Sequence, residues 1–302
     1  MEEEAVLRDS DRRNLHYRRS ALKTGLAGMV VAISGAGALA ASPEPTGATY
    51  DLTLRYEAYY SGFHVASGTA LIERDPDRYT VKSSAEARGI FDWFTGWRGQ
   101  ALSEGAVDAA GFFRPARHSN SGIWRGTERS TDLGFRPDGT IRVQRTAPPE
   151  PDEVTPIPVG MIDGSVDPIS VALSLSETLS TGGVCKGAFP IFDGSRRYDV
   201  AVEPEEAQVF KESSYSIFAG EAVGCRLSVE RIGGFRTDPS FKTEPEEGET
   251  EPDRLVWVGR PSPDFPPVPV RVEVQTKSGR VLLHLTEARM GEETISLYDA
   301  AE

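Results

Sequence analysis

Alternation of apolar and polar side chains constrains this chain more than any other feature. Residues 50–60 place apolar side chains at every second position and polar or charged ones between them. A period of two is typical of an amphipathic β-strand, whereas a helix repeats every 3.6 residues. Turn sequences at 61–62 and 75–77 separate this segment from two more strand-like segments, 63–74 and 78–87. Residues 50–87 therefore predict a three-stranded antiparallel meander.

The strand pattern continues along the rest of the chain, with one helical interruption. Further strands are predicted at 98–104, 112–120, 123–135, 140–145, 187–192, 196–203, 207–218, 221–232, 254–260, 268–276 and 280–288. One helix is predicted at about 166–180, because Asp167 is a good N-cap, Pro168 suits the first turn and Gly182 follows the apolar run. We expect a mainly β protein: a single large curled antiparallel sheet or open barrel-like system with one long buried helix.

Two biased stretches bear on domain organisation. Residues 146–158 contain five Pro, which predicts an extended connection. We expect residues 41–302 to form a single β-rich domain, and two lobes that meet near 146–164 are the alternative. Residues 236–253 are rich in Pro and Glu and poor in apolar side chains, so we expect an acidic, solvated loop there.

The N-terminal 40 residues have the pattern of a cleaved export signal. Arg18 and Arg19 belong to a basic region, and residues 24–43 carry no charge. Ala38 and Ala40 form a small-residue cleavage site. The basic region is twin-arginine-like, although a Sec signal fits as well. We expect a periplasmic protein that is cleaved near Ala40, with an N-terminal membrane anchor that faces the periplasm as the alternative.

Charge and cysteine content narrow the class of protein further. The chain has 46 Asp and Glu against 33 Lys and Arg, a net charge of −13. Nucleic-acid binding is not expected, because it needs clustered Lys and Arg. No stable membrane span is expected after signal cleavage. Cys185 and Cys225 are the two cysteines, and in an oxidising compartment we expect them to form a disulfide.

Motifs for catalysis or metal binding are missing from the sequence. The expected mature chain has three His, at positions 64, 118 and 284, and none has a second His or Cys at metal-ligand spacing. There is no G-x-S-x-G elbow. We therefore assign no catalytic residue, no metal site and no cofactor.

An aromatic cluster is the most conspicuous candidate for function. Phe91, Trp93, Phe94 and Trp97 lie within seven residues, and Trp124 follows near another predicted loop. One interpretation is that this segment plugs one end of the sheet as core. In the other, it lines the mouth of an apolar cavity or forms an exposed patch for a lipidic ligand or a partner.

Several stretches resemble the domain-of-unknown-function 3108 family of exported bacterial proteins. The resemblance rests on YDLTLRYEAYYSGFHVASG (50–68), DGSVDPISVALSL (163–175), IFDGSRRYDV (191–200) and GEAVGCRLSVERIGG (220–234). It implies an exported, β-rich envelope protein and carries over no catalytic residues. Within it, Arg196 and Arg197 are expected on opposite faces of a strand. One of them would form a structural ion pair across the sheet with Asp or Glu, or meet an anionic ligand group.

These observations lead to three functional hypotheses. The first is a non-enzymatic periplasmic protein that binds an apolar or amphipathic envelope component in support of cell-envelope integrity. Its candidate ligand-binding residues are Phe91, Trp93, Phe94, Trp97, Trp124, Arg196 and Arg197. The second is a protein–protein scaffold in the periplasm, with an envelope protein as partner. The third is a hydrolase whose site is assembled across strands. No oligomeric state is indicated.

Overall fold

One antiparallel sheet accounts for nearly all of the regular structure. The computed structural model describes residues 48–146, 154–237, 254–276 and 279–298. The predicted export signal, with Arg18, Arg19, Ala38 and Ala40, and most of the acidic loop 236–253 lie outside these residues. The described residues all belong to one compact unit, Glu44–Glu302.

Within the described residues the sheet has 14 strands, and every paired strand is antiparallel to its neighbour. The strands are β1 Tyr50–Tyr60, β2 Phe63–Arg74, β3 Arg78–Ala87, β4 Arg98–Val107, β5 Phe113–Trp124, β6 Thr127–Phe135, β7 Ile141–Thr146, β8 Gly187–Phe192, β9 Arg197–Phe210, β10 Gly220–Gly233, β11 Arg254–Gly259, β12 Val268–Thr276, β13 Gly279–Met290 and β14 Glu293–Ser296. Their order is β7-β6-β5-β4-β3-β2-β1-β13-β12-β11-β10-β9-β8, and β14 pairs with β13. The predicted fold class, a single large antiparallel sheet, is confirmed.

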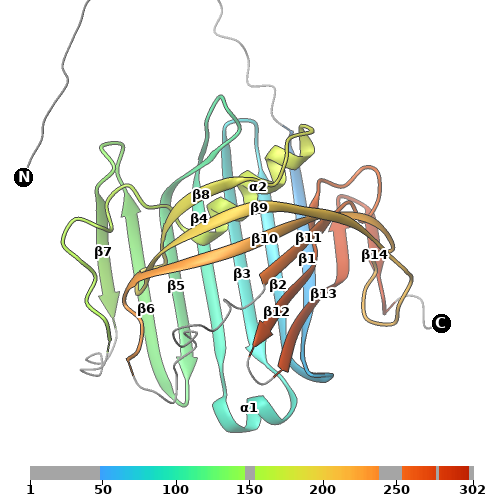
Figure 1. The fold of residues 1–302 in the computed structure, drawn as a ribbon, viewed down its shortest axis with the longest axis horizontal. Coiled ribbons are helices and arrows are strands. Elements are labelled where there is room, and N and C mark those ends of the chain that lie inside the picture. Colours follow the sequence, from blue (N-terminus) through green and yellow to red (C-terminus); the bar gives the residue numbers. More distant parts are fainter. Residues whose placement is uncertain (1–47, 147–153, 238–253, 277–278, 299–302) are drawn as a thin grey trace, which may run out of the picture. The chain divides into compact units, whose positions relative to one another are not determined.

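The C-terminal half of the sheet folds back across the N-terminal half. In Figure 1, β8, β9 and β10 arch across the front of the early strands, with helix α2 (Pro168–Ser180) beneath them. The β8–β9 turn reaches β5, where Asn120 Nδ2 donates a hydrogen bond to Asp193 O at 2.7 Å. We call the covered face of β1–β7 the inner face. Its side chains include Leu52, Leu54 and Val81, which are almost fully buried.

Helix α2 is the predicted buried helix. The Asp167 side chain accepts hydrogen bonds from the backbone of Ile169 and Ser170, which caps the first turn as expected. Val171 and Leu173 are buried against the sheet, and Ser170 and Ser174 are buried beside them. The helix therefore fills the space between the two halves of the sheet.

Two strand boundaries differ from those predicted. Separate strands at 112–120 and 123–135 are wrong at their junction, because β5 continues to Trp124 and the turn lies at Arg125 and Gly126. Both turn residues have positive φ, 49° and 76°, as tight hairpin turns require. The small polar residues 119–122 resemble a turn, but they stay in register with both β4 and β6.

The second difference is the length of β9. Strands at 196–203 and 207–218 are predicted separately, yet β9 runs unbroken from Arg197 to Phe210. Its partner β8 pairs only as far as Val202. Beyond that point β9 pairs with β10 alone, so Pro204 lies where a strand tolerates a missing N–H donor.

The two cysteines form a disulfide in the structure. Cys185 lies just before β8 and Cys225 lies on β10, with Cα atoms 5.6 Å apart. Both are buried in a cluster with Val202 and Val258. The bond ties the start of the β8–β9 hairpin to β10, as the sequence predicts for a disulfide-capable pair.

Removing this disulfide should lower stability substantially. We expect the Cys185→Ala/Cys225→Ala variant to lose about 2–5 kcal/mol of unfolding free energy, because the unfolded chain is no longer cross-linked. Urea denaturation measures the loss. Dithiothreitol is the control: it should shift the midpoint of the natural protein and leave the double variant unchanged. Equal urea midpoints for the natural protein without dithiothreitol and for the double variant would contradict the prediction.

Candidate ligand-binding site

Small side chains on the inner face leave a space beside the β8–β9 turn. Gly68, Ala85, Gly99 and Gly122 are directly paired across β2, β3, β4 and β5. The next row consists of Ala70, Ser83, Ala101 and Asn120, paired in the same way. Neither row carries a large side chain over these four strands. Six of these residues line one space together with the β8–β9 turn: Ser83, Ala85, Gly99, Ala101, Asn120 and Gly122. A cavity of about 510 Å³ results, which we call the inner-face cavity.

The β8–β9 turn covers one side of this cavity. Asp193 Oδ1 accepts hydrogen bonds from the backbone N–H groups of Ser195 and Arg196, at 2.9 and 2.7 Å, which shapes the turn. Arg145 donates a hydrogen bond to Gly194 O. A Cβ on Gly194 would lie 2.4 Å from Thr131 Cγ2, so only Gly allows the turn to approach the sheet this closely.

Aromatic and cationic side chains line different parts of the cavity. Trp97, just before β4, and Trp124, at the end of β5, line it from the β4–β5 side. Arg129 on β6, Arg145 on β7 and Arg196 in the turn line it from the β6–β7 side. None of the described residues that line this cavity is Asp or Glu.

The structure brings together three of the seven candidate ligand-binding residues. Trp97, Trp124 and Arg196 line the inner-face cavity. Arg197 does not: it is buried, donates to Met161 O at 2.8 Å and pairs with Asp199 at 2.6 Å. Arg196 lies in the turn, one residue before β9 begins, so the expected placement of both arginines in one strand is wrong for it. Arg197 forms the structural ion pair.

Phe91, Trp93 and Phe94 lie outside the cavity, on the short helix α1 (Gly89–Thr95). They are 41, 80 and 60% exposed, and no residue of α1 is buried. The interpretation of this segment as a core plug is therefore wrong, and these side chains form an exposed patch. Arg125 N donates to Thr95 O at 2.8 Å, which links α1 to the β5–β6 turn beside Trp124.

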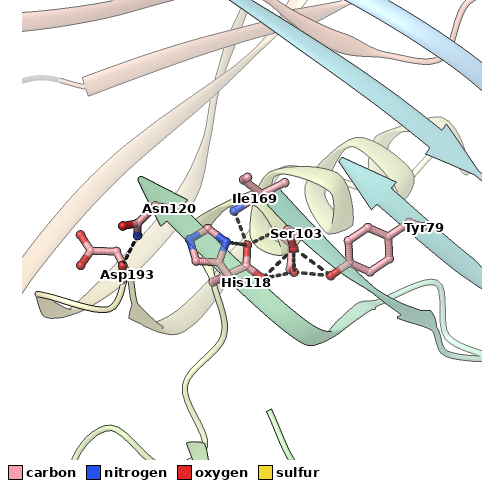
Figure 2. A network of polar contacts seen from close by, with 8 residues as sticks. Tyr79, Ser103, His118, Asn120, Ile169 and Asp193 are labelled. Atoms are coloured by element: carbon pink, nitrogen blue, oxygen red, sulfur yellow. Dashed lines mark hydrogen bonds and ion pairs between the residues drawn. The ribbon is translucent and has the colours of Figure 1, made fainter. Parts of the chain in front are cut away.

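A buried polar network lies deeper between α2 and the sheet (Figure 2). Asp167 is at its centre: Ser103 donates to Asp167 Oδ2 at 3.1 Å, and Ser170 donates to the same oxygen. The hydroxyl of Tyr79 lies 2.7 Å from Ser170 Oγ. His118 Nδ1 lies 3.4 Å from Asp167 Oδ1 without the alignment of a hydrogen bond.

The electrostatics of this network keep Asp167 ionised and Tyr79 protonated. Burial alone favours the neutral carboxyl, but His118 and Ser170 outweigh it and hold the pKa of Asp167 below its usual range. Burial, reinforced by the Asp167 charge, raises the pKa of the Tyr79 hydroxyl to about 12. The phenol can therefore donate a hydrogen bond at neutral pH.

Although this network contains Ser, His and Asp, it is not arranged for nucleophilic catalysis. In a catalytic triad the His lies between the Ser and the Asp, whereas here both serines bind Asp167 directly. His118, Ser103, Ser170 and Asp167 are each at most 2% exposed, so substrate has no access. The network instead anchors the start of α2 to β3, β4 and β5.

A second Ser–His–carboxylate group lies on the opposite face of the sheet. His64 Nε2 and Ser67 Oγ each lie 2.5 Å from the same oxygen, Glu57 Oε2. The Ser67 hydroxyl donates to the carboxylate and lies 3.5 Å from His64. Because the hydroxyl does not donate to the imidazole, His64 does not activate it as a nucleophile. The hydrolase hypothesis gains no support from either group.

Two wider grooves, of about 720 and 820 Å³, also lie on this opposite face. Their lining includes Thr69, Ser84, Gln100 and Ser121, which are paired in register across β2–β5. Charged residues beside them pair with one another, for example Arg88 with Glu86 at 2.6 Å. We interpret these grooves as the solvated face of an antiparallel sheet.

A comparison with family models decides the family. The model for "Protein of unknown function (DUF3108)" matches residues 55–286. The chain belongs to the DUF3108 family. The match spans β1 to β13, so it includes every strand that lines the inner-face cavity.

The other comparisons of this DUF3108 member, with curated proteins and with solved structures, identify no protein of known function. A comparison with curated proteins found no significant match. Among solved structures, a β-barrel-like DUF1849 protein from Brucella abortus is 12% identical with a TM-score of 0.46, covering 81% of this chain and 99% of that one. A provisionally assigned lipoprotein from Parabacteroides distasonis is 10% identical with a TM-score of 0.29, covering 80% and 96%.

The described residues contain no cluster of three or more His, Cys, Asp or Glu side chains that could hold a metal ion. Within the same part of the chain, no helix is long and apolar enough to cross a membrane.

One histidine of the DUF3108 domain should make stability depend on pH. His284 on β13 packs against the rings of Tyr59 and Tyr215. Burial, and secondly the positive charge of Arg271, lower the pKa of His284 to about 4. In the unfolded chain the pKa is about 6.5, so the unfolded state takes up the proton first as the pH falls.

We therefore expect the unfolding free energy to be highest above pH 6.5 and to fall as the pH drops towards 4. Replacing His284 with Gln should remove on the order of 1–2 kcal/mol of this loss. Urea denaturation at pH 7.0 and 4.5 measures the difference. The same pH dependence in the natural protein and the variant would show that His284 is not responsible.

Proposed function

We propose that this protein is a non-enzymatic binding protein whose inner-face cavity holds the apolar part of an amphipathic envelope component. The observation that carries the proposal is the cavity itself: a floor of small side chains with Trp97 and Trp124 on its β4–β5 side. Its volume of about 510 Å³ falls within the ~300–1,000 Å³ of typical small-ligand sites. A single alkyl chain or a fused ring system fits such a space.

Two further features support binding rather than catalysis. Tryptophan presents a large apolar surface together with one N–H donor, which suits ligands that are apolar in one part and polar in another. Of the two Ser–His–carboxylate groups among the described residues, one is buried, and in the other Ser67 donates its proton to Glu57 at 2.5 Å, with His64 Nε2 at 3.5 Å from the hydroxyl. The proposed role in support of cell-envelope integrity follows from this binding, together with export.

The proposed location is the periplasm. The Cys185–Cys225 disulfide supports export, because disulfides persist in oxidising compartments. We propose that residues 1–40 are removed as a signal and that residues 41–302 function as one β-rich domain. Mass spectrometry of protein recovered from the envelope fraction gives the N-terminus; a chain that retains residues 1–40 would favour the anchor.

The ligand-binding proposal is tested by what co-purifies with the protein. Native mass spectrometry of protein purified without detergent should show an adduct with the mass of an amphipathic molecule. The Ala101→Phe variant, in which a ring fills the cavity, should lack the adduct, because Ala101 lines the cavity. An adduct retained by the variant, or none in either protein after incubation with extracted envelope lipids, would contradict the proposal.

A protein–protein scaffold remains a second candidate because of the patch on α1. Ile90, Trp93 and Phe94 are 62, 80 and 60% exposed. Three neighbouring apolar side chains form a contiguous exposed patch, which is typical of an interaction site, whereas single exposed apolar residues are common on any surface. A scaffold that uses this patch predicts that Trp93→Ser/Phe94→Ser abolishes crosslinking to an envelope protein, whereas Ala101→Phe leaves it intact. The opposite pattern would favour the cavity.

A further inference from the structure

We infer that the ligand of the inner-face cavity carries an anionic group, of the phosphate, sulfate or carboxylate class, which the cavity's arginines bind. This inference rests on the proposed function and specifies the chemistry of the ligand. Arg129, Arg145 and Arg196 all line the cavity, and none of its described lining residues is acidic. In a chain with 46 Asp and Glu against 33 Lys and Arg, this local reversal of charge marks the cavity for an anion.

The three arginines come from elements that the fold brings together at one side of the cavity. Arg129 pairs across the sheet with Gly122, and Arg145 with Thr131, so both belong to the inner face of β6 and β7. Arg196 comes from the β8–β9 turn, which lies against Thr131. Residues far apart in the sequence therefore present positive charge to one space.

The position of the turn is set by the contacts of Asp193, and Arg196, three residues further on, lines the cavity. Asp193 uses its carboxylate on the backbone N–H groups of residues 195 and 196, not on a guanidinium. The neighbouring Arg197 is the one that pairs with a carboxylate, Asp199 at 2.6 Å. Arg196 is exposed, and its guanidinium carbon lies 5.9 Å from the centre of the Phe235 ring.

The two parts of the cavity thus match the two parts of an amphipathic anion. The side with Trp97 and Trp124 contacts an apolar or planar portion, and the side with the arginines contacts the charged group. Guanidinium groups bind phosphate and carboxylate oxygens with paired, charge-assisted hydrogen bonds. A neutral amphiphile would contact the tryptophans but would form no charge-assisted hydrogen bonds with the arginines.

Isothermal titration calorimetry with three probes tests the inference. Decyl phosphate, decyl maltoside and inorganic phosphate are each titrated into the full exported chain, with both detergents below their critical micelle concentrations. We expect decyl phosphate to bind about tenfold or more tightly than decyl maltoside, and the difference to shrink at high salt. Inorganic phosphate alone should bind more weakly than decyl phosphate, because it makes no contact with the tryptophans.

Arg196→Gln is the informative variant, because Arg196 is on the surface and its replacement spares the core. It should weaken decyl phosphate binding about tenfold and leave decyl maltoside binding unchanged. Arg78→Gln, on β3 and outside the cavity lining, is the matched control and should change neither affinity.

The outcomes separate the inference from the proposed function. Equal affinity for the two detergents, or equal weakening of both by Arg196→Gln, would overturn the anionic ligand but leave amphiphile binding intact. Inorganic phosphate binding as tightly as decyl phosphate would overturn the amphipathic assignment in favour of a free small anion. If neither detergent binds, both the inference and the proposed function fail.

Discussion

Replacing Ala101 with Phe is expected to abolish binding of decyl phosphate, lowering its affinity about 100-fold or more. Ala101 lies on the inner face of β4, between Ser83 and Asn120 in the row that forms the cavity floor. A benzyl group at this position occupies the space that the alkyl chain would take. A 100-fold loss corresponds to about 2.7 kcal/mol, which is well within what exclusion of an apolar chain can cause.

The effect on stability should be small, because the ring enters a cavity rather than a packed core. The matched control is Thr69→Phe, which adds the same ring on the opposite face of the sheet, where Thr69 lines the solvated grooves. Calorimetric titration of both variants measures affinity, and circular dichroism checks folding. Unchanged affinity in folded Ala101→Phe would show that the ligand does not occupy this cavity.

The second large effect is expected at Asp167, on stability rather than on binding. Asp167→Ala removes the acceptor for the Ile169 and Ser170 amides and for the buried Ser103 hydroxyl. It also leaves His118 buried without its neighbouring charge. Because buried polar groups that lose their partners incur their full desolvation penalty, we expect a loss of about 3–5 kcal/mol.

Asp138→Ala provides a matched comparison for this second prediction. Asp138 also caps backbone and side-chain groups, those of Thr140, but it lies in an exposed turn. Its removal should reduce the unfolding free energy far less than removal of Asp167, because water replaces the lost hydrogen bonds. Urea denaturation of both variants gives the two values. Similar values for Asp167→Ala and Asp138→Ala would mean that burial of the network contributes little.

Much of the fold could be predicted from local patterns in the sequence. Alternation located the strands of the first meander, and Asp167 followed by Pro168 located the start of α2, because each signal depends only on neighbouring residues. Strand boundaries were predicted wrongly where small polar residues, such as Ser119–Gly122, are compatible with both a turn and a solvent-facing strand.

The cavity could not be predicted in the same way, because it depends on register between strands distant in sequence. Gly68, Ala85, Gly99 and Gly122 look unrelated along the chain and form a row only when four strands are aligned. A search for small residues at alternate positions of successive predicted strands is the signal that could have found them. The fold-back of the β8–β9 turn onto β5 depends on long-range packing, which no local pattern reveals.

The segment 89–97 shows a further limit of sequence reasoning. Four aromatic rings in seven residues fit a core plug and an exposed patch equally well, because the apolar composition of a segment does not specify whether other parts of the protein cover that segment. The structure separates them: Trp97 turns into the cavity, whereas Trp93 and Phe94 on α1 face outward.

The most direct test of the central claim is a crystal structure of the protein with 10-bromodecyl phosphate, in which anomalous scattering locates the bromine. We expect a bromine peak inside the inner-face cavity near Trp97 and Trp124, with the phosphate beside Arg196. A peak only in the grooves of the opposite face, or only on α1, would contradict it.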